Sequence, residues 1–348
     1  MAGRIARQVN KIVIIGAPTS AGASVAGSEK APEHLRAAGL ATGLREAGFE
    51  VTDLGDSATI PFQPDDENPR ARNLKSVVRS TESLRPLVEQ AIRTGGLPLI
   101  LGGDCSIALA AVAGLRRYYP RALSLFYFDR DPDLNVPATS PSGFLDGMTV
   151  AHIAGRGAAE LMRSQQLEPP LVREPEIVLF GIARLDPAEQ EWLWRSPLHS
   201  HKAEKIAGRP PAEAAREAVE EIHGHQHEFL FHLDADVISQ GEMPAVDHPG
   251  AGGLGLEYVQ QVFTALAAER YLVAIEITGY NPDRDSDGQA AQTLVRLITN
   301  ALRGRLAANS EKYPATSTET TEVNAAPEPL ETSQAQPDSN KEMDSPVE

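Results

Sequence analysis

The chain has 348 residues, of which 41% are hydrophobic and 23% are charged, and its formal net charge is −16. This length suffices for one large α/β domain or two small ones, and the acidic balance excludes a basic nucleic-acid binder. A membrane span and a signal peptide are not expected, because no apolar run reaches roughly 18 residues and the amino terminus lacks an apolar core. The single cysteine, Cys105, excludes an internal disulfide framework, so we expect a cytoplasmic protein without nucleic-acid or membrane partners.

Short apolar runs alternate with amphipathic segments along the chain. The predicted strands cover residues 11–18, 51–54, 97–101, 123–128, 177–180, 228–233 and 271–277. The predicted helices cover residues 31–47, 74–94, 107–118, 188–194, 211–223, 256–269 and 290–306. Strands that alternate with helices indicate right-handed crossovers between parallel strands. The sequence therefore predicts an α/β protein with three layers, α/β/α, around a mainly parallel central sheet.

The last forty residues differ in composition from the rest of the chain. Residues 309–348 hold nine acidic residues and two lysines, so they contribute −7 and leave −9 for residues 1–308. They are rich in Ser, Thr, Pro and Glu and contain almost no large apolar side chains. Such a segment buries too little surface to offset its ordering entropy. We predict one domain over residues 1–308 and a disordered acidic tail over residues 309–348.

Acidic residues follow three of the predicted strands, at the edge of a parallel sheet where ligands bind. Five to seven potential metal ligands collect at these strand ends: Asp129, Asp131 and Asp133 after one strand, Asp234 and Asp236 after another, and Asp104 and Cys105 after the third. Carboxylates packed closely together repel one another unless cations neutralise them. Oxygen ligands suit Mn²⁺, Mg²⁺ or Ca²⁺. The sequence therefore predicts a site for one or two divalent cations.

Two less specific interpretations stay open beside this one. A single Asp-x-Asp pair is usually a solvated turn, although two such pairs after different apolar strands favour a metal site. The alternating His223, His225 and His227, with His232 nearby, are either a second metal site or an exposed polar turn, and the turn is the more common case.

Seven short motifs then follow one another in a recognisable order. They are Ile14–Pro18 with Ala31–Arg36, Gly102–Ser106, Asp129–Asn135, Ser142–Met148, Gly181–Glu189, Asp234–Asp236 with Pro244 and Gly252–Gly253, and Asn281–Pro282. Together they resemble the arginase/agmatinase/formiminoglutamase (ureohydrolase) family. The resemblance implies an α/β/α protein that hydrolyses a small guanidino compound with two Mn²⁺ ions bridged by hydroxide. It also makes a homo-oligomer, a trimer or hexamer, plausible.

The resemblance assigns roles to individual positions. Asp129, Asp133, Asp234 and Asp236 match metal-ligand carboxylates of the family, and Asp133 would also hold the bridging hydroxide. The positions that match recognition of the substrate's amino-acid end in arginases are Asn135, Ser142, Asp186 and Glu189.

The departures from the family pattern are equally specific. Cys105 and Asp131 stand where the family has metal-binding histidines, and both can still ligate a metal. Asp146 replaces the proton-shuttling histidine, Phe144 replaces the asparagine beside it, and Gly279 replaces the glutamate that clamps the guanidinium. Glu276 is no simple substitute for that clamp, because residues three apart on a strand face opposite sides.

Five aspartates and a thiolate would make this site more anionic and harder than the usual one, so Mg²⁺ or Ca²⁺ could take the place of Mn²⁺. The first functional hypothesis is a divergent metal-dependent hydrolase of C–N bonds in a guanidino or amidino compound. Metal-activated hydroxide would attack the planar carbon, and Asp133 and Asp146 would manage protons. The alternative is a catalytically inactive member that retains the fold as a metal-binding or regulatory protein.

Overall fold

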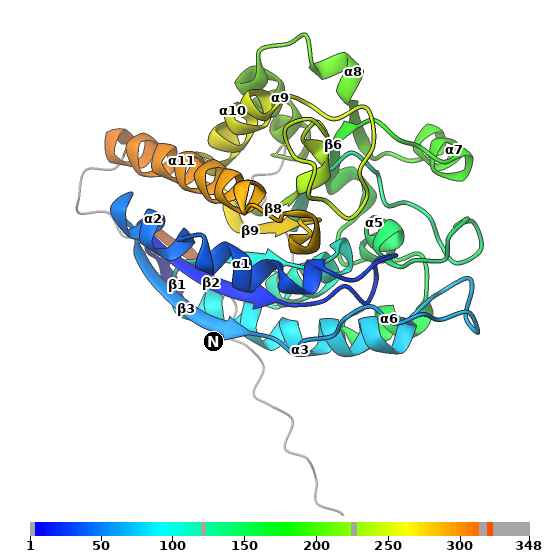
Figure 1. Cartoon of the computed structure of the whole chain (residues 1–348). Helices are drawn as coiled ribbons and strands as arrows, with labels where there is room; N and C mark the ends of the chain where they lie inside the picture. Colours follow the sequence, from blue (N-terminus) through cyan, green and yellow to red (C-terminus); the bar gives the residue numbers. More distant parts are fainter. Residues whose placement is uncertain (1–3, 120–122, 224–227, 313–318, 323–348) are drawn as a thin grey trace, which may run out of the picture.

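The computed structural model describes residues 4–119, 123–223, 228–312 and 319–322. An eight-stranded parallel sheet forms the centre of the molecule (Figure 1). Its strands are β2 Lys11–Ala17, β3 Glu50–Asp56, β4 Leu97–Gly102, β5 Leu123–Phe128, β6 Ile177–Ile182, β7 His199–Lys202, β8 Glu228–Asp234 and β9 Leu272–Thr278. The strand order is β3-β2-β4-β9-β8-β5-β6-β7, and every neighbouring pair is parallel. The central strands are buried on both faces, which explains their almost continuous apolar sequences.

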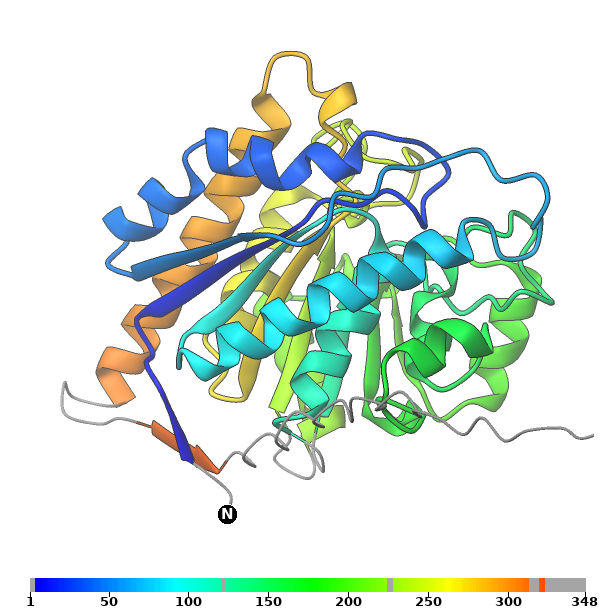
Figure 2. The same ribbon diagram turned by 90° about the horizontal axis from the view of Figure 1, so that it is seen from below.

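Helices cover both faces of this sheet (Figures 1 and 2). They are α1 Ala31–Ala37, α2 Leu40–Glu46, α3 Leu74–Arg93, α4 Ala108–Arg116, α5 Thr149–Ile153, α6 Ala159–Ser164, α7 Pro187–Arg195, α8 Ala203–Ile206, α9 Pro211–His223, α10 Leu256–Ala267 and α11 Gln289–Lys312. Short 3₁₀ turns are η1 Ser28–Lys30, η2 Cys105–Ile107, η3 Asp146–Met148, η4 Glu174–Glu176, η5 Ala235–Val237 and η6 Pro282–Arg284.

Each layer of helices shares a separate apolar core with one face of the sheet. The core on one face joins the sheet to α1, α2, α9, α10 and α11. The core on the other face joins it to α3, α4, α5 and α6. In Figure 2, α3 and α11 lie on opposite sides of the strands. The predicted three-layer α/β/α fold with a parallel central sheet is thereby confirmed.

Two differences from the predicted elements have local causes. The single helix predicted over residues 31–47 is two helices, because Gly39 between α1 and α2 adopts a left-handed backbone with φ 92°. Strand β7 was not predicted. Its sequence, His199 to Lys202, is polar because it lies at the edge of the sheet and is only partly buried.

The two ends of the described chain pair with each other. β1 (Arg4–Arg7) and β10 (Glu319–Glu322) form a separate two-stranded antiparallel sheet, with Arg4 opposite Glu322. Helix α11 continues to Lys312, so the predicted domain end at residue 308 falls inside it, and residues 319–322 are a strand where a disordered tail was predicted. Such pairing gives the tail backbone hydrogen-bond partners that its composition does not reveal. Residues 313–318 and 323–348 of the predicted tail lie outside the described residues.

Within the residues that the structure describes, no helix has both the length and the apolar character needed to cross a membrane.

A buried histidine in α5 couples the stability of the fold to pH. The His152 ring is 1% exposed; its Nδ1 lies 2.6 Å from the Met148 carbonyl, and its Nε2 accepts the Ala158 N–H at 3.1 Å. Burial lowers the pKa of His152 to about 4. Between about pH 6.5 and pH 4, the histidine is therefore protonated in the unfolded chain and neutral in the folded chain.

We expect the free energy of unfolding to fall by about 2 kcal/mol from this group between pH 7.5 and pH 5, since stability is lost as the pH drops toward the folded pKa. Urea denaturation at both pH values measures the effect. His152→Gln should remove this part of the pH dependence, whereas a change at the exposed His34 should leave it intact. Equal pH dependence in the wild type and His152→Gln would contradict the prediction.

Candidate active site

A pocket of about 350 Å³ opens where β4, β5 and β8 end. The structure brings eleven predicted site residues into its lining: Cys105, Asp129, Asp131, Asp133, Asn135, Ser142, Asp146, Asp186, Glu189, Asp234 and Asp236. The other strand-end candidate, Asp104, lines a smaller cavity instead, and its carboxylate accepts the N–H groups of Gly22 and Ser106. The cause is the strand order, because β4, β9, β8 and β5 are neighbours and all end at the same edge.

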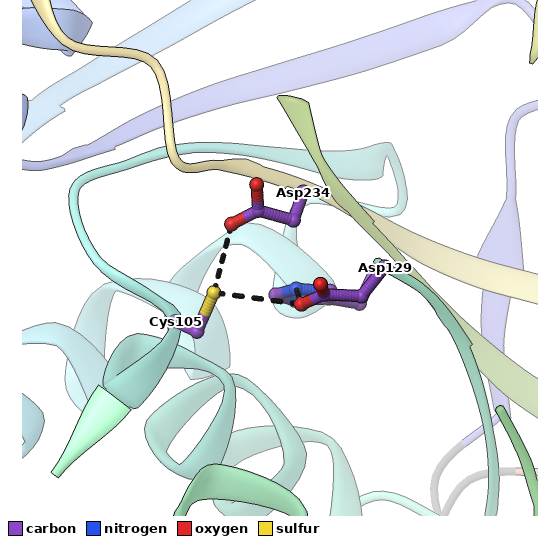
Figure 3. Close-up of side chains that lie close together, drawn as sticks. Cys105, Asp129 and Asp234 are labelled. Atoms are coloured by element: carbon purple, nitrogen blue, oxygen red, sulfur yellow. Dashed lines mark hydrogen bonds and ion pairs between the residues drawn. The ribbon is translucent and has the colours of Figure 1, made fainter. Parts of the chain in front are cut away.

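Four potential ligands form the first cluster at the floor of this pocket: Cys105, Asp129, His232 and Asp234. One ligand atom from each lies within 4.8 Å of all the others, and all four residues are buried. The Cys105 thiol donates to Asp234 Oδ2 at 2.9 Å and lies 3.9 Å from Asp129 Oδ2 (Figure 3). Burial, reinforced by the neighbouring carboxylates, raises the pKa of the Cys105 thiol well above its ordinary value. A bound cation would favour the thiolate instead.

The repeated Asp-x-Asp spacing has a local structural function as well as a chemical one. Asp129 Oδ1 accepts the N–H of Asp131, and Asp234 Oδ1 accepts the N–H of Asp236, both at 2.7 Å. Asp129 and Asp234 thus each use one carboxylate oxygen to stabilise the turn that follows their strand. The other oxygen, Oδ2 in both residues, faces Cys105. The backbone thereby orients the two carboxylates before any ligand binds.

Three aspartates form the second cluster, which shares Asp129 with the first. Its members are Asp129, Asp131 and Asp236, again with ligand atoms within 4.8 Å of one another. Two arginines already contact this cluster. Arg184 binds Asp131 through Nε at 2.5 Å and Nη2 at 2.7 Å, and Arg130 Nη2 lies 2.9 Å from Asp236 Oδ2.

The buried carboxylates of the pocket floor are electrostatically strained without a cation. Burial, followed by repulsion from neighbouring carboxylates, raises the pKa of Asp129 and Asp236 well above the usual range. Asp236 Oδ1 is buried and has no hydrogen-bond partner within the described residues. These carboxylate oxygens suit a divalent cation, which would neutralise their charges and bind the unpaired Oδ1 of Asp236.

The charge expected from the sequence needs correction. The expectation counted five aspartates and a thiolate but no basic groups, whereas Arg130, Arg184 and His248 all lie against the acidic side chains. The first cluster also contains the nitrogen of His232. The centre is therefore less anionic than expected. It is also a softer set of metal ligands, because the nitrogen of His232 joins the sulfur of Cys105 and the carboxylate oxygens.

Asp133 belongs to neither cluster in the described part of the chain, although it lines the same pocket. Its Oδ2 accepts a hydrogen bond from the buried Tyr127 hydroxyl. Burial raises the pKa of Asp133 well above its ordinary value, an effect that this hydrogen bond opposes. Its backbone is left-handed, with φ 50°, a conformation that aspartate tolerates better than most residues.

Asp146, in the 3₁₀ turn η3, is paired with a histidine from the loop after β8. His248 Nε2 lies 3.1 Å from Asp146 Oδ2, and both residues line the pocket. Burial opposes the charged form of His248, but the hydrogen bond to Asp146 and the nearby carboxylates outweigh it and raise the pKa of His248 to about 9. At neutral pH the pocket wall therefore carries a protonated imidazole.

Of the four residues predicted to recognise the substrate's amino-acid end, Asn135, Asp186 and Glu189 are linked by hydrogen bonds in the pocket lining. Asn135 Nδ2 donates to Asp186 Oδ2 at 2.9 Å, and Asp186 is the residue before α7. Glu189 accepts the N–H groups of Asp186 and Leu134 at 2.9 and 3.0 Å. Burial raises the pKa of Glu189 to about 7. Glu189 thus joins the start of α7 to the loop after β5, while Ser142 is an exposed wall residue.

Comparison with known proteins agrees with this geometry. The model of the Arginase family matches residues 10–303. The chain belongs to the arginase family. It is 29% identical to the arginase of Bacillus caldovelox over 300 residues, which cover 85% of this chain and 99% of that protein. It is 30% identical to the arginase of Brevibacillus brevis over 294 residues, covering 84% and 98%.

Solved structures of the family share this fold. The native arginase of Bacillus caldovelox at pH 5.6 matches with a TM-score of 0.77 and 26% identity, over 84% of this chain and 98% of that one. The formimidoylglutamase of Bacillus subtilis matches with a TM-score of 0.68 over 86% and 88%, at 19% identity, which shows the fold alone.

A side chain at the position of the arginase-family guanidinium clamp would be strained here and would force Asp234 to move. Gly279 follows β9 with φ 75°, and a Cβ built on it would collide with the Asp234 carboxylate. Glu276 points elsewhere, as the alternation of the strand predicted: it is fully buried and lies 2.7 Å from His232 Nδ1. A guanidinium in this pocket would therefore have to be held by other carboxylates.

Four residues that contact the site were not assigned to it from the sequence: Arg130, His248 and Tyr127 were not singled out, and His232 was considered only beside the alternating histidines. Two of them had a usable signal, because residues two apart on a strand share a face. His232 precedes Asp234 by two positions on β8, and Tyr127 precedes Asp129 by two at the end of β5. Arg130 and His248 contact the site from loops, where no strand periodicity predicts their position. Of the alternating histidines, His225 and His227 lie outside the described residues, as does the side chain of His223.

Proposed function

We propose that this chain is a metal-dependent hydrolase of C–N bonds in a small guanidino or amidino compound. One observation carries the proposal: two metal-sized clusters share Asp129 at the floor of a pocket whose wall holds Asn135, Ser142 and Asp186. Membership of the arginase family supports the reaction class, because the relatives reported above are named arginase or formimidoylglutamase. The substrate would lie between the clusters and that wall.

The metal would be held by the first cluster, by the second cluster, or by both. The family resemblance favours Mn²⁺, with two ions as the expectation, and the carboxylates also suit Mg²⁺ or Ca²⁺. When bound, the metal would supply an acidified water as nucleophile. The partial burial of the pocket would strengthen this electrostatic effect by excluding bulk water.

The chain's own groups would move protons and orient the substrate. The protonated His248, held by Asp146, is placed to donate a proton to a departing amine from the pocket wall. Asp133, hydrogen-bonded by Tyr127, is placed to accept one near the floor. The remaining acidic groups favour a cationic substrate over an anionic one.

Metal analysis and a substrate panel test the proposal together. Purified full-length protein should contain a near-stoichiometric divalent metal and should release urea, ammonia or formamide from at least one guanidino or formimino compound. Asp234→Ala should lose both properties, because it removes a first-cluster ligand. Asp146→Asn should keep the metal and lose activity by about 10²–10⁴-fold, the usual effect of removing an acid–base partner. A metal-loaded wild type inert on the whole panel would contradict the hydrolase assignment.

The second candidate is a metal-binding protein without catalysis. Specific observations favour it: arginines contact two carboxylates of the second cluster, and Gly279 provides no guanidinium clamp at a position where a Cβ would collide with the Asp234 carboxylate. The substrate panel distinguishes it from the hydrolase, since both candidates bind metal. We further propose a cytoplasmic location and assembly into trimers or hexamers, the latter measurable by sedimentation.

A further inference from the structure

A buried histidine of β8 reaches the metal cluster from a position with no counterpart among the sequence motifs. His232 is fully buried, and its Nε2 lies 4.0 Å from Asp129 Oδ2 and 3.2 Å from Thr278 Oγ1. Its ring stacks on Tyr127, with centroids 4.0 Å apart and planes 8° from parallel. The imidazole is therefore held in one orientation, with Nε2 directed at the first cluster.

A buried carboxylate sets the hydrogen-bonding state of this histidine. Glu276, on the neighbouring strand β9, contacts His232 Nδ1 through Oε2 at 2.7 Å, and its Oε1 has no partner within the described residues. An ionised Glu276 accepts a hydrogen bond from Nδ1–H, and in that tautomer the lone pair of the imidazole lies on Nε2. A carboxylate behind a histidine in this way is how proteins orient metal-binding imidazoles and raise their basicity.

We propose that His232 is a metal ligand oriented by Glu276, and that the first cluster binds one divalent cation of the class that accepts nitrogen and sulfur, with Zn²⁺ as the best fit. Its imidazole would replace the histidine lost at position 105, from the next strand but one in the sheet. The inference replaces the two Mn²⁺ ions that the family resemblance favours with one ion in the first cluster, because thiolate and imidazole ligands suit Zn²⁺ better than Mn²⁺. It concerns only the metal part of the proposed function and does not depend on catalysis.

The distances within the first cluster agree with a compact four-ligand site. The separations between ligand atoms are 2.9 Å from Cys105 Sγ to Asp234 Oδ2, 3.9 Å from Sγ to Asp129 Oδ2, and 4.0 Å from Asp129 Oδ2 to His232 Nε2. Tetrahedral zinc with bonds of about 2.0–2.3 Å needs ligand separations of about 3.3–3.8 Å. Movements of less than about 1 Å would complete the tetrahedron. A site of sulfur, nitrogen and two oxygens favours zinc over Mg²⁺ and Ca²⁺.

The distribution of charge favours a single ion. Among the described residues, no lysine or arginine forms an ion pair with Asp129, Asp234 or Glu276, so the negative charge of the first cluster lacks compensation. In the second cluster, Arg184 and Arg130 already neutralise Asp131 and Asp236. A second cation there would have to displace two guanidinium groups, one of which, Arg130, is only 2% exposed.

The test uses the metal-free full-length protein titrated with Zn²⁺ and examined by X-ray absorption at the zinc edge. We expect one zinc per chain, one sulfur at about 2.3 Å, and nitrogen or oxygen ligands at about 2.0–2.1 Å with the outer-shell signal of one imidazole. Two zinc ions per chain, no zinc, or a spectrum without sulfur and imidazole would each overturn the inference. This measurement needs no variant, so folding defects cannot obscure it.

Variants then assign the imidazole. His232→Gln should weaken Zn²⁺ binding at least about 100-fold, and Glu276→Gln about 10–100-fold, the range for losing the partner behind a ligand. His152→Gln, which changes another buried histidine away from the pocket, should bind like the wild type. Unchanged affinity in a folded His232→Gln would overturn the role of His232. If the protein bound zinc through His232 but hydrolysed no compound of the substrate panel, the proposed function would be contradicted and the role of His232 would stand.

Discussion

Asp129→Asn is expected to stabilise the metal-free protein while abolishing its stabilisation by metal. Asp129 is shared by both clusters, so its loss removes a ligand from each. The same carboxylate is buried against other acidic groups, and its pKa is raised well above the usual range by burial first and by Asp234 next. A neutral amide avoids that penalty. We expect metal-free Asp129→Asn to gain about 1 kcal/mol or more in free energy of unfolding at pH 7.

Urea denaturation with and without metal measures both effects. The wild type should gain about 2.7 kcal/mol when the free metal is 100 times its dissociation constant, and Asp129→Asn should gain nothing. Because a raised acid pKa costs stability as the pH rises, the difference between the metal-free proteins should grow from pH 4 to pH 8. Asp146→Asn, in the pocket wall, is the control that keeps the metal response. An equal metal response in Asp129→Asn would refute the shared-ligand assignment.

Gly279→Glu, which restores the residue that the family places at this position, is expected to damage the protein and to leave guanidino hydrolysis no better. The left-handed backbone at Gly279 costs a larger residue about 1–2 kcal/mol. A Cβ there collides with the Asp234 carboxylate, and overpacking of this kind costs about 1–3 kcal/mol more. The added carboxylate also repels Asp234. We therefore expect a loss of about 2–5 kcal/mol in the free energy of unfolding.

The same variant should bind metal more weakly, because Asp234 has to move away from the first cluster. Denaturation and metal titration measure the two effects. Gly147→Glu is the matched control: it also lies in the pocket, has no positive φ, and its Cβ would meet no heavy atom within 4 Å. If Gly279→Glu were as stable as the wild type and gained activity on guanidino compounds, the site would be a damaged arginase centre rather than a remodelled one.

The residues predicted for the site lie where parallel strands end, and for that reason they could be found without a structure. Asp129 and Asp234 each follow an apolar run, and a parallel sheet collects such positions at one edge. Asp131 follows the same apolar run as Asp129, and the ordered motifs additionally align Cys105 and Asp131 with ligand positions of the family. The helix boundary at Gly39 and the polar edge strand at His199 escaped prediction, since a backbone angle and a place at the edge of a sheet do not appear as hydrophobic periodicity.

The sequence by itself determined the α/β/α architecture, the family, and the carboxylates that line the pocket, because these depend on local patterns repeated along the chain. Only the tertiary structure decided which groups complete the centre. His232 and Glu276 meet because β8 and β9 are neighbours in the sheet, and Arg130 meets Asp236 across 106 positions of sequence. Strand order and loop packing set such distances, and no spacing within the chain encodes them. The net charge of −16 is likewise a sum over the whole chain, so it does not show that the fold places Arg130, Arg184 and His248 against the acidic side chains of the site.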